Sequence, residues 1–170
     1  MRWIVLLAAL AMPVVSWFSQ SGAFGPTNGA ISDRYPTLLV AAGYAFAIWG
    51  VIFLWDVVFG LWQLRRRRPD LPGVRGWAAA GFALTAAWTP VFSNQWFLAA
   101  LAIIWAALVC LLVAAVRAAP TDATGGPRAW AAYPLAPHAG WRPMAAFLIP
   151  PPGSTAPQYA PSPYLFRWCL

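Results

Sequence analysis

Few residues in this chain have side chains that commonly do chemistry, and their spacing does not assemble a catalytic or metal site. The 170 residues contain one His, two Cys and four acids, all of them Asp, while Glu and Lys are absent. His138 stands between Pro137 and Ala139, away in sequence from any Cys or acid, and a lone His is a poor metal site. The sequence also lacks a Gly-rich phosphate loop and a Ser/His/Asp set in a supporting context. We therefore predict no catalytic residue, no metal site and no required cofactor.

Asp56 is the exception, because it is the one charge within an apolar stretch, residues 38–64. The residues that share its helix face, at spacings of three and four, are Phe46, Trp49, Phe53, Gly60 and Gln63. Asp56 precedes Arg65 by about 13 Å of helix rise, so the carboxyl group would lie deep in a bilayer. An ionisable group at that depth usually faces the interior of a bundle. Two interpretations stay open: a ligand or proton site, or a buried acid kept neutral or bonded to a neighbouring helix.

The composition specifies the solvent around these residues. Hydrophobic residues make up 61% of the chain and charged ones 9%, against about 25% charged in an average soluble domain. Too few charged residues are present to cover the surface of a water-soluble protein. The composition therefore excludes an ordinary soluble enzyme and indicates that the chain lies in lipid. The stretches that approach the roughly 20 apolar residues of a span are residues 3–18, 38–64, 77–92 and 96–116, with a fifth that starts at Trp130 and is interrupted by Arg142 and Pro143. We predict an all-α integral membrane bundle of five transmembrane helices, the fifth truncated or disrupted.

The net charge is +7, and all eleven basic residues are Arg. Four of them form one run, residues 65–68, directly after an apolar stretch, where basic loops hold topology and meet anionic lipid. This placement favours membrane lipid as a partner over nucleic acid. If the helices alternate in direction, Arg2, this run and Arg117 share one side, and Arg34 lies on the other. We predict a cytoplasmic N-terminus, an external loop over residues 19–37 and residence in a bacterial cytoplasmic membrane.

The first apolar stretch has a second interpretation. Ala9, Leu10 and Ala11 resemble the small-residue cleavage site of a signal peptide. The apolar run continues past that site to Phe18, so we favour an uncleaved helix.

Several of the 12 Trp residues lie near predicted helix ends, which is typical of an interfacial belt. They are Trp3, Trp62, Trp77, Trp96 and Trp130. Separately, one face of the stretch 77–92 brings together Trp77, Gly81, Thr85, Trp88 and Phe92. Periodicity does not decide whether this face only packs against other helices or forms an aromatic wall for a flat ligand.

Three segments carry motifs in a fixed order: residues 43–53 (GYAFAIWGVIF), 84–92 (LTAAWTPVF) and 133–148 (YPLAPHAGWRPMAAFL). Together they resemble the tryptophan-rich sensory protein family (TspO/MBR), which is related to the mitochondrial translocator protein, or peripheral benzodiazepine receptor. They are similar, in turn, to the family's Pro-x-Trp-x-Phe-x-x-x-Trp, Leu-Asn-x-x-Trp-Ser-Pro-Leu-Phe and Val-Pro-Tyr…Ala-Trp-Val-Ser-x-Ala-x-x-Leu-Asn segments, on helices two, three and five. The sequence departs from the family where Tyr44 replaces a Trp and Asp56 an apolar residue.

The resemblance implies a five-helix, often dimeric, transmembrane domain over residues 1–148 and an aromatic-lined cavity. The cavity would bind a flat apolar ligand, porphyrin-like (including haem) or lipid-like, for sensing, regulation or transport. Carried over by position, the ligand-binding residues would be Tyr44, Phe46, Trp49, Phe53, Thr85 in place of an Asn, Trp88, Trp141 and Ala145. Two alternatives stay open: a structural or partner-binding membrane subunit without a ligand, and a weak tetrapyrrole-degrading enzyme.

Residues 149–170 differ from the rest of the chain. They contain six prolines, which cannot continue a spanning helix. We predict a Pro-rich, non-helical tail, and we hypothesise that a reading-frame change replaced the end of the fifth helix. The alternative is a genuine Pro-rich tail, and translation of the other reading frames tests the two.

Overall fold

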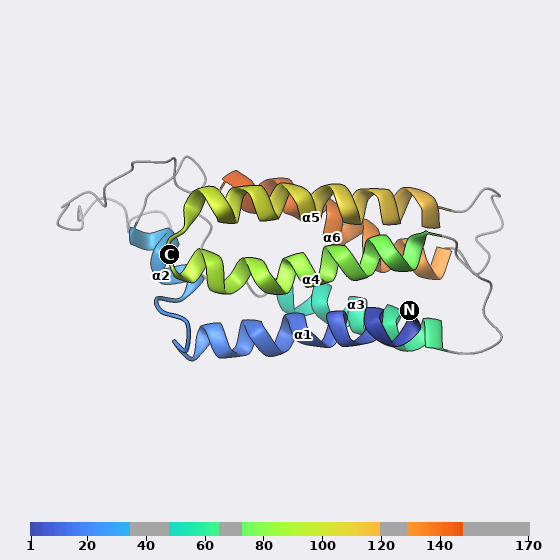
Figure 1. Ribbon diagram of the computed structural model, residues 1–170, viewed down its shortest axis with the longest axis horizontal. Helices are drawn as coiled ribbons and strands as arrows, with labels where there is room; N and C mark the ends of the chain where they lie inside the picture. Colours follow the sequence, from blue (N-terminus) through green and yellow to red (C-terminus); the bar gives the residue numbers. More distant parts are fainter. Residues whose placement is uncertain (35–47, 65–72, 120–128, 148–170) are drawn as a thin grey trace, which may run out of the picture.

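The computed structural model describes residues 1–34, 48–64, 73–119 and 129–147. The helices over these residues are α1 (Arg2–Gln20), α2 (Asn28–Arg34), α3 (Ile48–Leu64), α4 (Val74–Ser93), α5 (Phe97–Ala118) and α6 (Ala129–Phe147). Five of them are long and run side by side along the molecule, and the short α2 sits across one end (Figure 1). The predicted all-helical class is therefore confirmed for the described residues.

Small residues bring the helices together. A Cβ atom at Gly81 on α4 would lie 2.6 Å from Cγ of Leu111 on α5, so only glycine permits this approach. At Gly60 on α3 a Cβ atom would lie 3.2 Å from the Cα atom of Leu6 on α1. Close backbone approach at small residues is the usual way that helices associate in lipid, where burial of apolar side chains provides little drive.

The molecule is apolar outside and holds much of its polarity inside. Large exposed side chains include Trp3, Leu7 and Leu98, each about two-thirds exposed at 67%, 64% and 65%. By contrast, Asp56 and His138 are fully buried. Among the described helices, α1 and α5 are long and apolar enough to cross a membrane, and α3 is a shorter apolar helix. This distribution suits a molecule whose outer surface meets hydrocarbon.

The predicted face of α3 is confirmed where it is described. Phe53, Asp56, Gly60 and Gln63 are all buried, and Trp49 is half-buried. Phe46 lies outside the described residues. On α4 the predicted shared face is only partly buried, because Trp77 at its start is exposed.

The expected loop over residues 19–37 contains a helix that we did not predict. Thr27 caps α2, since its Oγ1 accepts a hydrogen bond from the amide of Ala30 at 3.2 Å. Ile31 of α2 is buried in a hydrophobic cluster with Phe92 and Ile104. The apolar residues of α2 are two neighbours, Ala30 and Ile31, which give too weak a periodic signal to reveal so short a helix.

The expectation that Arg142 and Pro143 interrupt the last span is wrong for the described residues, because α6 continues through both to Phe147. Pro134, Pro137 and Pro143 all lie inside this helix. Prolines are tolerated in membrane helices where neighbouring groups satisfy the freed backbone. Arg142 does not end the helix because its charge is turned inward and bonded. The tail over residues 149–170 lies outside the described residues.

Three of the described Arg residues lie at one end of the bundle. Arg2 begins α1, Arg75 lies in the first turn of α4 and Arg117 in the last turn of α5. These helix termini meet at the end marked N in Figure 1, and α2, which ends at Arg34, lies at the other. Arg117 also lies 5.9 Å from the centre of the Trp77 ring. The alternation of the helices that the sequence suggested is therefore present in the fold.

Candidate functional site

A pocket lies between the helices, in the half of the bundle toward α2, and is lined by side chains from every described helix. Its cavity volume is about 40 Å³. Its lining consists of Ser16 and Gln20 of α1, Asn28 of α2, Trp49 and Phe53 of α3, Thr85, Trp88 and Thr89 of α4, Ile104 of α5, and Arg142 of α6. The pocket is therefore aromatic on one side and polar on the other.

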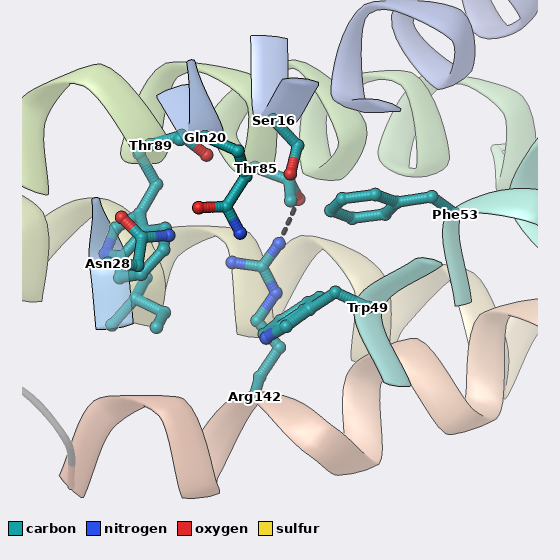
Figure 2. A pocket seen from close by; sticks show the side chains of 10 residues that line it. Ser16, Gln20, Asn28, Trp49, Phe53, Thr85, Thr89 and Arg142 are labelled. Carbon is teal, nitrogen blue, oxygen red and sulfur yellow. Dashed lines mark hydrogen bonds between the residues drawn. The ribbon is translucent and has the colours of Figure 1, made fainter. Parts of the chain in front are cut away.

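Beneath the pocket, a chain of hydrogen bonds joins α3, α6 and α4. Nδ1 of His138 lies 2.6 Å from Oδ2 of Asp56, and its Nε2 lies 3.1 Å from Nη2 of Arg142. The same guanidinium nitrogen donates to Oγ1 of Thr85, whose hydroxyl donates to the carbonyl of Gly81 at 2.7 Å. Figure 2 shows the bond between Arg142 and Thr85 as a dashed line. Three helices are thus tied together by buried side chains.

The donor and acceptor types fix the state of His138 in this chain. A guanidinium can only donate, so Nε2 of His138 must be the accepting, unprotonated nitrogen. The ring proton then sits on Nδ1 and is donated to the carboxylate of Asp56. In this assignment His138 is neutral, and the negative charge of Asp56 offsets the positive charge of Arg142 across the imidazole.

Aromatic rings enclose the imidazole on several sides. Phe82 stacks on His138 with ring centroids 5.9 Å apart and planes at 13°. Trp49 and Phe53 meet it edge-on, at 5.9 and 6.2 Å. Because water is excluded by these rings, the hydrogen bonds of His138 are worth more than they would be at a surface.

Arg142 forms the floor of the pocket. It is the largest fully buried side chain in the described part of the chain, at 1% exposure. Its guanidinium carbon lies 5.9 Å from the centre of the Trp49 ring, within range of a cation–π interaction. In Figure 2 the side chain extends from α6 toward Thr85, with Trp49 beside it and Gln20 and Asn28 on its far side.

Several buried polar atoms at the pocket have no hydrogen-bond partner among the described residues. They include Nε of Arg142, Nε1 of Trp88 and Oδ1 of Asn28. An unpaired buried donor costs roughly 1–3 kcal/mol. Such atoms beside empty space indicate that water or a ligand completes their bonding.

The predicted ligand residues fall into three groups. Trp49, Phe53, Thr85 and Trp88 line the pocket. Trp141 is half-buried and does not line it, and Asp56 lies behind His138 rather than in the lining. The predicted residues that lie outside the described backbone are Tyr44 and Phe46, and the side chain of Ala145 is likewise outside what the structure describes.

Sequence reasoning missed His138 and Arg142 as site residues. It treated the first as a lone histidine and the second as an interruption of the helix. Their spacing of four residues puts them on one face of α6, and a charged residue in a neighbouring span, Asp56, needs a partner of opposite charge. These two signals together could have identified the cluster. The structure bonds Asp56 to His138 of the neighbouring helix α6, with 2.6 Å between Oδ2 and Nδ1.

A family model described as TSPO-like protein matches residues 2–148, which includes all the described helices. No curated protein and no solved structure matches the chain.

Proposed function

The chain belongs to the TSPO-like family of membrane proteins, and from that premise we propose that it binds a small, flat, largely apolar ligand in the pocket between its helices. Binding would serve sensing, regulation or transport across a bacterial cytoplasmic membrane. The described helices are the scaffold for this role.

A five-span arrangement is part of the proposal. The long helices have 17 to 22 residues, which corresponds to about 26–33 Å of helix rise. The hydrocarbon core of a bilayer is about 30 Å thick. The Arg residues at the ends of α1, α4 and α5 would then face the cytoplasm, as the positive-inside rule requires.

One observation carries the proposal: Trp49, Phe53 and Trp88 present aromatic rings to the same pocket from two facing helices. Flat π-systems stack against or meet such rings edge-on, and the pairs gain about 0.5–1.5 kcal/mol beyond the burial of area. Thr85 and Thr89 add hydroxyl groups that can orient a polar substituent.

The space in the pocket bears on the size of the ligand. A cavity of about 40 Å³ accommodates a few water molecules. A molecule of one or two rings therefore requires limited rotation of the half-buried Trp49 and Trp88. A porphyrin requires the helices themselves to move apart.

Tryptophan fluorescence tests the proposal. We expect saturable quenching by protoporphyrin or by 2-naphthamide in detergent, and we expect Trp49→Ala to weaken binding about tenfold. Trp105→Phe is the matched control, because Trp105 lies on the outer side of α5 and is 51% exposed. Equal affinities in the wild type and Trp49→Ala, or the absence of any ligand-induced thermal shift, would contradict a ligand site and favour a structural subunit.

A further inference from the structure

We infer that the ligand carries a carboxylate and that Arg142 binds this group at the floor of the pocket. The inference rests on the proposed function, since it concerns the chemical class of the ligand at the same site. It adds to an apolar, ring-stacking ligand one anionic group at a defined position.

The first argument is the supply of hydrogen-bond donors. Nε of Arg142 and Nε1 of Trp88 are buried at the pocket without partners among the described residues. Both groups donate and cannot accept. Oδ1 of Asn28 is also unpaired, and a rotation of that amide by half a turn presents its NH₂ group instead. A group that only accepts, with two oxygens, matches this lining best.

The second argument is the distribution of charge. Among the described residues, Arg142 is the one charged residue in the lining. The carboxylate that offsets it, Asp56, lies on the far side of His138, which bonds Asp56 through one ring nitrogen and Arg142 through the other. A ligand in the pocket therefore meets the cation directly and the anion only across an imidazole ring. Charge-assisted bonds from a guanidinium to a carboxylate are about twice as strong as neutral ones.

The third argument concerns the remainder of the ligand. The guanidinium lies beside the Trp49 ring, so a carboxylate bonded there would direct the rest of the molecule along the aromatic side of the pocket. A one- or two-ring aromatic acid fits this arrangement and the limited space. A fatty acid offers the same carboxylate on an acyl chain, and the experiment separates the two.

Paired ligands provide the test on the full-length protein in detergent. We expect 2-naphthoate to bind about 10- to 100-fold more tightly than 2-naphthamide, its neutral counterpart. Arg142→Gln should bring this ratio close to one, whereas Arg142→Lys, which keeps the charge, should retain part of it. Trp105→Phe should leave the ratio as in the wild type.

A second variant is expected to increase, rather than reduce, the preference for the acid over the amide. Asp56→Asn removes the offsetting charge and keeps a hydrogen-bonding side chain, so the preference for 2-naphthoate should rise by roughly tenfold. A merely structural role for Asp56 would lower the affinities for both ligands together. If Arg142→Gln does not fold, the double variant Asp56→Asn/Arg142→Gln takes its place in the experiment. It carries neither charge, so we again expect a ratio of affinities close to one.

The outcomes separate this inference from the proposed function. Equal wild-type affinities for the acid and the amide would overturn the carboxylate and leave the aromatic pocket standing. Binding of neither compound would overturn both. Oleate binding more tightly than 2-naphthoate, with the same dependence on Arg142, would retain anion recognition and overturn the aromatic body of the ligand.

Discussion

Replacing Asp56 with Leu tests the buried chain of hydrogen bonds most severely. The substitution removes the acceptor 2.6 Å from Nδ1 of His138 and leaves Arg142 without the charge that offsets it. If only an interhelical hydrogen bond were lost, the cost in a membrane protein would be about 0.6–1.7 kcal/mol. Removal of one member of a buried charge pair costs about 3–5 kcal/mol. Both residues are at most 1% exposed, so we expect the larger value.

The double variant Asp56→Leu/Arg142→Leu distinguishes these two effects. It removes both charges and leaves unmet hydrogen bonds at His138 and an unmet acceptor at Thr85, which still donates to Gly81, at about 1–3 kcal/mol. The coupling energy of the cycle should therefore be at least about 3 kcal/mol. The free energies would come from reversible unfolding in mixed detergent micelles, followed by circular dichroism. Additive single losses, or a loss below about 1 kcal/mol for Asp56→Leu, would refute the argument that opposite charges are paired across the imidazole.

Three further predictions concern packing, ligand contact and topology. Gly81→Leu should destabilise the fold by about 1–3 kcal/mol through overpacking, measured in the same unfolding assay, whereas Gly140→Ala, with nothing within 4 Å of its Cβ, should have little effect. Trp49→Ala should reduce a ligand-induced rise in the thermal midpoint, and an unchanged rise would place the ligand elsewhere. In a chain without its native cysteines, Asn94→Cys should react with a membrane-impermeant maleimide added outside intact cells, and Gly76→Cys should react only after lysis. The reverse pattern would show that the orientation is wrong.

The sequence predicted the long helices and the buried face of α3, because these depend on local periodicity. The burial of Phe53, Asp56, Gly60 and Gln63 follows from spacing along a single helix, and lipid leaves little alternative for a polar side chain. The structure adds the close approach of α4 and α5 at Gly81, where the absence of a side chain permits the contact.

The site itself depended on relations between helices. His138 meets Asp56 only because α6 lies against α3 at a particular height and rotation, which the periodicity of neither helix specifies. Arg142 looked like the end of a span because a charge in lipid is costly, and only its partners on α4 and α6 make it acceptable. The short α2 escaped prediction because one turn or two of helix has little periodicity to read.

Photolabelling tests the central claim of a ligand site among these helices most directly. The protein in detergent would be labelled with a naphthalene that carries a diazirine, and the modified peptides would be mapped by mass spectrometry. We expect label on the segments around Trp49 and Thr85, and we expect excess 2-naphthoate or 2-naphthamide to suppress it. Label spread over the outer surfaces of α1 and α5, with no competition by either compound, would contradict the account.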